Sequence, residues 1–156
     1  ISCRINDYPR TAKEIACIFN LDDSSATKGC KNAIAIVNQL EKNVENNDKT
    51  HFNETLPLDF IERYCSRLNI NKELTNLCKF VACKVNKGNL IPENTPHAVA
   101  SGIIYFITQI CNNSISKTQI YEISNISEVT INKCFKKLEI YKELLIPPVI
   151  INKYTK

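Results

Sequence analysis

Three lysines, Lys133, Lys136 and Lys137, lie close together near the end of the chain, with no acidic residue between them. In a helix, side chains three and four positions apart lie on the same side. A row of ammonium groups at that spacing neutralises phosphate charge and suits contact with DNA. The same three side chains would also form the solvated face of an ordinary amphipathic helix. The residues alone leave both interpretations open.

Charge and composition limit the classes of protein that the chain could belong to. The formal net charge is +4, and residues 116–156 carry seven of the 20 basic residues against four of the 16 acidic ones. The positive excess therefore lies around the lysine cluster, although its total is too small to indicate nucleic-acid binding by composition alone. Apolar residues make up 44% of the 156, Gly and Pro number only three and six, and no segment alternates like a strand. We expect an all-α fold with one well-packed core.

Other kinds of chemistry are not indicated. The eight cysteines are spread singly without a Cys-x-x-Cys pair, and His51 and His97 are isolated, so we expect no metal site and reduced cysteines. No Gly-rich phosphate loop, placed nucleophile or pair of carboxylates occurs, so we expect no catalytic residues, no enzyme activity and no small-molecule substrate. The longest apolar run, residues 98–111, is too short to cross a bilayer, and we expect no membrane partner.

The segment that contains the lysines is the second copy of an internal sequence repeat, and the repeat indicates which helices position them. At an offset of 105 residues, the segment from Thr11 aligns without gaps with the segment from Ser116. Both copies begin with a capping box and place a second capping residue, Asp22 or Ser127, after a short break. This is the spacing of a helix-turn-helix, an arrangement that also occurs in plain helical bundles. The capping boxes are Thr11 with Glu14 and Ser116 with Gln119.

Apolar periodicity and capping residues predict a five-helix domain after a polar, Asn-rich linker. One of these helices, at 95–111, is apolar nearly all round and carries small residues such as Gly102, so we expect it at the centre of the bundle. The predicted helices are 58–68, 71–87, 95–111, 116–125 and 127–141. The predicted organisation is a helix-turn-helix at 1–42, a linker at 43–56, the five-helix domain at 57–145 and a tail at 146–156.

Several segments in a fixed order resemble the cyclin-like repeats of the transcription factor IIB core. "CRINDYPRTAKEIACIFNL" is similar to the end of that family's first repeat. Successive helices of that family's second repeat are similar to the segments "IERYCSRLNINKEL", "TPHAVASGIIYFITQ" and "SNISEVTINKCFKKL". The resemblance implies a complete second repeat preceded by only the C-terminal part of a first one. It also implies a zinc ribbon N-terminal to this segment in the full-length protein, with no cofactor in the segment itself.

The function that the resemblance implies is that of a general transcription initiation factor. Such a factor binds the TATA-binding protein on promoter DNA and helps to recruit and position RNA polymerase II. The expected location is the nucleus, or a cytoplasmic factory or virion if the source is viral. Two alternatives stay open: a cyclin-like regulatory subunit that binds a protein kinase, since fold does not fix function, and the related initiation factor of RNA polymerase III.

The resemblance also implies which residues contact DNA in the major groove upstream of the TATA element. The recognition helix would begin near Ser127. Where the family has arginine in "VTIR", this chain has Asn132 in "VTIN". Because arginine suits paired contacts with guanine and asparagine suits adenine, we expect a weaker sequence preference, shifted towards adenine. The implied base contacts are Val129, Thr130 and Asn132, and the implied phosphate contacts are Lys133, Lys136 and Lys137.

Four further basic residues are candidate contacts with a partner protein or with DNA. Arg63 and Arg67 lie four apart on one predicted helix, and Lys28 and Lys31 lie in the first copy of the repeat. A solvated surface explains the arginines equally well. In the first copy, the acidic pair at Asp22 would meet phosphate unfavourably, so a structural role or a protein contact is favoured over DNA recognition there.

Overall fold

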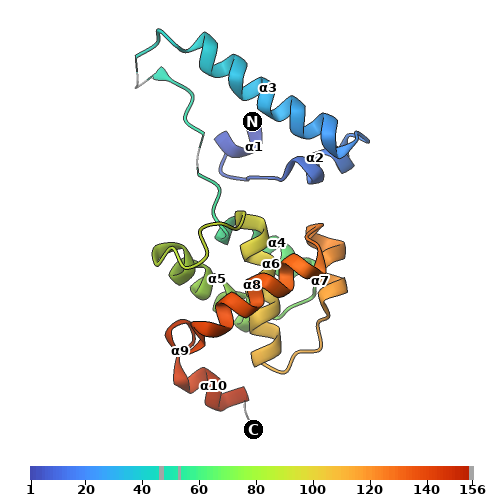
Figure 1. Ribbon diagram of the computed structural model, residues 1–156, viewed down its shortest axis with the longest axis vertical. Coiled ribbons are helices and arrows are strands. Elements are labelled where there is room, and N and C mark those ends of the chain that lie inside the picture. The colour runs from blue at the N-terminus through green and yellow to red at the C-terminus, as the bar shows by residue number, and fades with distance from the viewer. Residues whose placement is uncertain (46–47, 53, 155–156) are drawn as a thin grey trace. The chain divides into compact units, whose positions relative to one another are not determined.

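The structure is a computed structural model that describes residues 1–45, 48–52 and 54–154. Every regular element in these residues is a helix, which confirms the predicted all-α fold. The chain divides into two compact units, Ile1–Thr55 and Leu56–Lys156 (Figure 1). The boundaries between repeats that the sequence predicts stay predictions.

The first unit leaves much of its apolar surface exposed. Its buried side chains include the small Ala16 and Ala26. The large side chains of Ile18, Phe19 and Leu40 are 69%, 67% and 76% exposed. So much exposed apolar area is unusual for a folded unit and marks surface that is suited to contact with other protein. The helices of this unit are α1 (Ser2–Ile5), α2 (Ala12–Ile18) and α3 (Asp23–Leu40).

The predicted caps begin both longer helices of the first unit. At α2, the Glu14 N–H donates to Thr11 Oγ1 at 3.1 Å, and the Thr11 N–H donates to the Glu14 carboxylate at 2.7 Å. At α3, the Ser25 N–H donates to Asp22 Oδ1 at 2.8 Å. Hydrogen bonds from Ser24 and Ser25 hold the pKa of Asp22 well below its usual range. Local sequence therefore fixes where these helices begin.

The predicted linker, 43–56, falls partly on residues 46–47 and 53, which lie outside the described residues. Its described part is hydrogen-bonded to the first unit. The Thr50 N–H donates to the Glu41 carboxylate at 2.8 Å, and the Thr50 hydroxyl donates to the other oxygen. These bonds lower the pKa of Glu41. The chain at Thr50 is thus tied back to the end of α3.

The second unit contains the five predicted helices. Each observed helix lies inside its predicted range, because the predictions included capping residues that lie outside the helix proper. The capping box before α7 is confirmed: the Gln119 N–H donates to Ser116 Oγ at 3.2 Å, and the Ser116 N–H donates to Gln119 Oε1 at 2.9 Å. The helices are α4 (Leu58–Arg67), α5 (Lys72–Lys87), α6 (Pro96–Ile110), α7 (Lys117–Ser124) and α8 (Glu128–Ile140).

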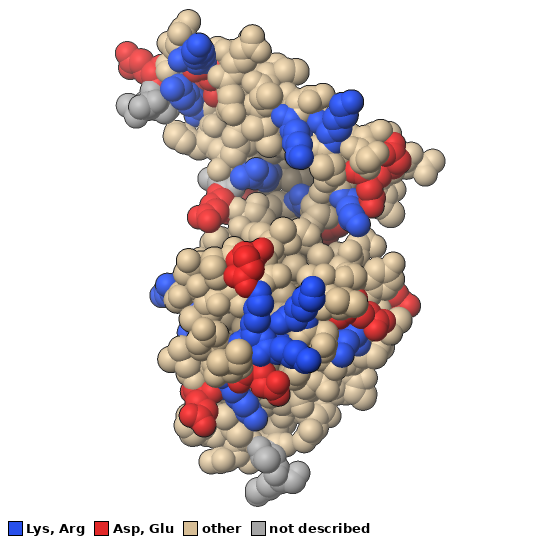
Figure 2. All heavy atoms as spheres, viewed as in Figure 1, with Lys and Arg blue, Asp and Glu red and all other residues tan. Residues whose placement is uncertain are grey.

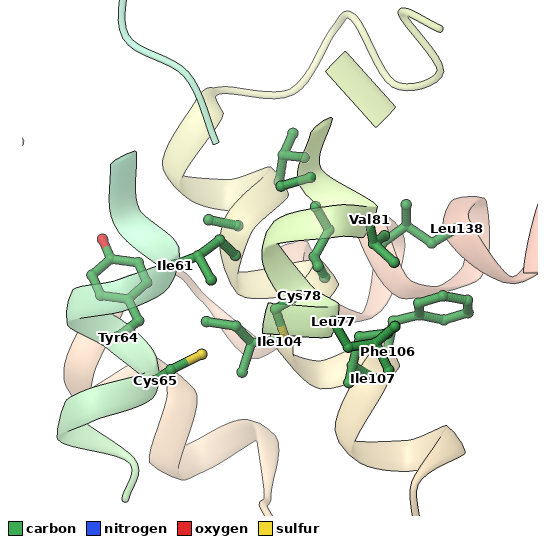
Figure 3. Close-up of a cluster of buried hydrophobic side chains, with 14 of the residues drawn as sticks. Ile61, Tyr64, Cys65, Leu77, Cys78, Val81, Ile104, Phe106, Ile107 and Leu138 are labelled. Atoms are coloured by element: carbon green, nitrogen blue, oxygen red, sulfur yellow. The ribbon is translucent and has the colours of Figure 1, made fainter. Parts of the chain in front are cut away.

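Helix α6 lies at the centre of this unit, as its apolar sequence predicts. It packs against α4, α5, α7 and α8. Ile103, Ile104 and Ile107 are completely buried, and Figure 3 shows α6 side chains meeting those of the neighbouring helices. Its small residues allow close approach: a Cβ on Gly102 would lie 2.3 Å from Cys134 Cβ of α8. Helix α8 is thereby fixed against the body of the unit.

Asparagine, rather than glycine, makes the sharp turns after the helices. Gly88 caps α5, but its φ is −82°, and the left-handed residue is the next one, Asn89, at φ 46°. Asparagine tolerates this conformation because its short side chain can hydrogen-bond locally. The repeat shows the same device: Asn20 and Asn125, 105 positions apart, have φ values of 52° and 55°. The two copies therefore share their turn geometry as well as their caps.

The predicted tail contains helix that the sequence analysis did not anticipate. Helix α9 (Lys142–Leu145) leads into α10 (Pro148–Tyr154). The Asn112 side-chain amide donates to the Tyr154 carbonyl at 2.8 Å. Lys153 forms an ion pair with Glu73 at the start of α5. The hydrogen bond from the Lys153 ammonium lowers the pKa of Glu73, and the same bond raises the pKa of Lys153. Helix α10 is therefore held by groups distant in sequence.

Replacing Glu73 with glutamine should loosen α10, because the attraction to the Lys153 ammonium is lost. We expect amide hydrogen exchange in α10 to rise several-fold at one fixed pH, a modest change because exposed ion pairs stabilise weakly. Acidification should act in the same direction. A carboxyl with a depressed pKa stabilises only above that pKa, so the contribution is lost as pH falls through it.

The matched control is Glu62→Gln, which breaks the ion pair of Glu62 with Lys79. Exchange in α10 should not change in this variant. Equal exchange in wild type and Glu73→Gln would contradict the assigned role of Glu73.

Candidate nucleic-acid interface

The turn between α7 and α8 is built by short-range hydrogen bonds. Asn125 ends α7 in the left-handed conformation, and its N–H donates to the Tyr121 carbonyl at 2.8 Å. The buried Ser124 hydroxyl donates to the Ile120 carbonyl at 2.7 Å and accepts the N–H of Ile126 at 3.2 Å. Every polar group named here has a partner within the turn. These hydrogen bonds fix the geometry of the turn and therefore the direction of α8.

The buried face of α8 decides which residues point outward. Ile131, Cys134 and Leu138 are completely buried, at the three- and four-residue steps of a helical face. Burial raises the pKa of the Cys134 thiol to about 11, so the thiol stays neutral and packs as a small apolar group. Phe135 packs beside them with its ring 5.3 Å from that of Tyr105. The opposite face of α8 is left for solvent or a partner.

The three residues expected to contact bases lie near the start of α8. They differ in how exposed they are and in whether their polar groups are already hydrogen-bonded. Val129 is 65% exposed and offers an apolar surface without rearrangement. Thr130 is half-buried, and its hydroxyl shares a hydrogen bond of 2.9 Å with that of Ser127. Asn132 is half-buried, and its Oδ1 accepts a hydrogen bond of 2.9 Å from Lys117 Nζ. The acceptor atom that adenine recognition requires therefore already accepts one hydrogen bond from a cationic donor.

The three lysines expected to contact phosphates are not equivalent. Lys133 and Lys136 are exposed on the outer face of α8. Lys137 is half-buried, forms an ion pair with Glu93, and donates to Asn94 Oδ1 at 3.1 Å. Phosphate contact by Lys137 would compete with this pairing. The structure thus brings two of the three ammonium groups together at the surface and ties the third to the loop before α6.

Helix α7 contributes a basic residue that the sequence analysis missed. Lys117 Nζ lies 2.9 Å from Asn132 Oδ1 and 5.2 Å from the centre of the Tyr105 ring. Its position, directly after the capping residue Ser116, was the only available signal. Periodicity relates residues of one helix, whereas this contact joins two helices across the turn.

The other four basic candidates are spread over different elements. Lys28 and Lys31 are exposed on α3 of the first unit. Arg67 is exposed at the end of α4. Arg63 is half-buried, donates to the Asp59 carbonyl at 3.1 Å, and lies 4.8 Å from the centre of the Phe60 ring. Arg63 is thus mainly a packing residue, while the rest face solvent.

Positive charge gathers on the face of the second unit that carries α8. Figure 2 shows lysine and arginine side chains clustered over the middle of this unit, where Figure 1 places α8. An acid also lies at the start of the helix. Glu128, in the first turn of α8, accepts a hydrogen bond of 2.8 Å from the Thr118 hydroxyl. Its negative charge is stabilised there by the positive end of the helix dipole. The face is basic but not uniformly so.

The described residues show two further features that bear on function. Within 1–45, 48–52 and 54–154, no group of three or more His, Cys, Asp and Glu side chains is placed to hold a metal ion. Over the same residues, no helix has both the length and the apolarity to cross a membrane.

Known proteins are similar to this chain over most of its length. A transcription initiation factor IIB-like protein of Acanthamoeba polyphaga mimivirus is 33% identical over 145 residues, which are 93% of this chain and 31% of that protein. The transcription initiation factor IIB of Xenopus laevis is 27% identical over 87% of this chain and 40% of its own length. That of Oryza sativa subsp. japonica is 30% identical over 94% and 45%. The chain spans less than half the length of each of these relatives.

The family comparison matches the part of the chain that holds the candidate interface. The model of the transcription factor TFIIB repeat matches residues 50–141, which include α4 to α8 and the turn between α7 and α8. The all-α bundle with a central apolar helix agrees with the resemblance noted in the sequence. The chain belongs to the transcription factor TFIIB repeat family.

Proposed function

We propose that this chain is the DNA-binding core of a general transcription initiation factor. It binds the complex of the TATA-binding protein with promoter DNA and helps to recruit and position RNA polymerase II. The relatives named above are transcription initiation factors, which supports this class of function and not that of an enzyme. Its place of action is the nucleus or, for a viral protein, the site of viral replication.

One observation carries the proposal: α8 is the second helix of a helix-turn-helix and exposes Val129, Lys133 and Lys136 on one side while its other side is buried. Such a helix fits the major groove, where ammonium groups meet phosphates and an apolar side chain meets a thymine methyl. The buried contacts with α6 hold it in that orientation.

The proposal is tested by a gel shift on a TATA-containing duplex, with and without the TATA-binding protein of the same source. We expect the chain to retard the protein–DNA complex further and its affinity to fall steeply with salt, because each phosphate contact releases counterions. A regulatory subunit of a kinase would bind no duplex at any salt concentration. Absence of a further shift at low salt would refute the proposal.

Replacing Glu93 with glutamine should strengthen DNA binding. The substitution releases Lys137 from its ion pair and removes a negative charge near α8. We expect affinity for the promoter complex to rise about threefold, and the slope of log affinity against log salt to steepen by up to about one, as for one added phosphate contact. Fluorescence anisotropy over a salt series measures both quantities.

The control for Glu93→Gln is Glu62→Gln, which also removes one acid from an exposed ion pair but lies on α4. It should leave the salt slope unchanged. An identical rise in affinity in both variants would show that net charge alone, and not the release of Lys137, is responsible.

A further inference from the structure

The contact between Lys117 and Asn132 determines which atoms Asn132 can offer to a base. Lys117 Nζ lies 2.9 Å from Asn132 Oδ1. An ammonium group has three donors and no acceptor, so only the oxygen of the amide can face it. The usual ambiguity between the oxygen and nitrogen of an amide is thereby removed. The Nδ2 group, with its two hydrogens, is left as the free end of the side chain.

This orientation changes the expected base. Recognition of adenine by asparagine needs Oδ1 to accept from the adenine N6 amino group while Nδ2 donates to N7. Asn132 Oδ1 keeps a second lone pair, but an adenine amino group that used it would lie beside the Lys117 ammonium, and two donors repel each other there. Guanine presents two acceptors, N7 and O6, at the same edge. A base edge with two acceptors therefore matches the Lys117–Asn132 pair better than an edge with an amino group.

Other contacts hold Lys117 in a position from which its ammonium group can also bond a base. Its ammonium group lies 5.2 Å from the centre of the Tyr105 ring, a cation–π distance. Tyr105 is in turn packed edge-on against Phe135 of α8, with ring centres 5.3 Å apart. Lys117 directly follows the capping residue Ser116, so its backbone is fixed by the start of α7. The ammonium group uses one donor on Asn132 and keeps others free.

We propose that Lys117 and Asn132 together form a composite donor pair that recognises guanine. The proposal rests on the proposed function, since it concerns the same α8 face on promoter DNA. The free donors of Asn132 Nδ2 and Lys117 Nζ bond N7 and O6 of one guanine. Two side chains thus supply the positive charge and the paired donors that the missing arginine at position 132 would supply alone. Adenine is disfavoured because its amino group faces a donor.

The test is a selection of binding sites by the 156-residue chain with the TATA-binding protein, using duplexes randomised upstream of the TATA element. We expect wild type to enrich guanine at one position by about tenfold over adenine, within the range for a paired contact. Lys117→Ala should abolish that preference and turn it towards adenine, because no ammonium group then lies beside Oδ1 to repel the adenine amino group. Asn132→Ala should remove the preference for either purine.

Lys133→Ala is the matched control, a lysine of the same face that is assigned to a phosphate. It should weaken binding to all sequences equally and leave the selected base unchanged. Circular dichroism verifies that each variant keeps the wild-type helix content.

The outcomes separate this inference from the proposed function. If no duplex forms the ternary complex at low salt, both fail. If the complex forms but wild type selects adenine at that position, or if Lys117→Ala selects the same base as wild type, only the composite donor pair is overturned.

Discussion

Gly102→Ala should lower the free energy of unfolding of the Leu56–Lys156 unit by about 3 kcal/mol, the upper part of the range for overpacking a core. The added Cβ would lie 2.3 Å from Cys134 Cβ and 3.5 Å from Cys134 Cα. The Cβ of residue 134 belongs to α8 itself, so no change of rotamer can relieve the overlap. Either helix must shift, and Ile103 and Ile131 beside the contact are completely buried.

Thermal unfolding followed by circular dichroism measures this effect. For a unit of this size, such a loss lowers Tm by roughly 15 °C. The control is Gly29→Ala in α3, where a Cβ would have no atom within 4 Å. That variant should be unchanged or slightly more stable, because alanine is a better helix former than glycine. An unchanged Tm in Gly102→Ala would show that α6 and α8 do not approach this closely.

A double variant separates steric overlap from other effects of the substitution. Cys134→Gly removes the Cβ that Gly102→Ala would meet. Alone, it costs stability through the lost side chain and the flexible backbone. Combined with Gly102→Ala, it should be much less destabilising than the sum of the two single changes. Simple additivity would mean that the two positions are not in contact.

Lys133→Glu combined with Lys136→Glu should weaken binding to the promoter complex by about 100-fold at moderate salt and flatten the salt slope by about two. Both ammonium groups are exposed on the outer face of α8, so each is available to a phosphate. Reversal replaces attraction with repulsion at two adjacent phosphates. Anisotropy titrations with a labelled TATA duplex and the TATA-binding protein measure the affinity and the slope.

The control for the charge reversal is Lys72→Glu combined with Lys87→Glu, two exposed lysines of α5. It changes net charge by the same amount on another helix. Affinity should fall only slightly, because these charges act on the DNA only through the long-range electrostatic field of the protein. If both double variants lose the same affinity, α8 has no special role in contacting phosphate.

Much of the candidate interface could be predicted from the sequence because the hydrogen bonds that define its helix ends are local. The caps at Thr11, Asp22, Ser116 and Ser127 act on backbone groups three residues away, and all four are present. Ile131, Cys134 and Leu138 recur at the three- and four-residue steps of one helical face, and all three are buried. These features predict where α8 begins and which side it turns outward.

Helix in the predicted tail was missed because its support is not local. The sequence predicts only a tail at 146–156, yet α10 forms there, with hydrogen bonds and an ion pair to Asn112 and Glu73. A helix of this length gains little from its own hydrogen bonds and depends on packing. No pattern within residues 146–156 could indicate those partners.

The sequence by itself determined the all-α class, the repeat, the helix starts and the outward face of α8, because each depends on residues within one or two helical turns. Only the tertiary structure decided which polar groups of that face are free. Lys117 reaches Asn132 across 15 positions, and Glu93 reaches Lys137 across 44. Hydrogen bonds and ion pairs act over a few ångströms, so such partners are known only once the chain has folded.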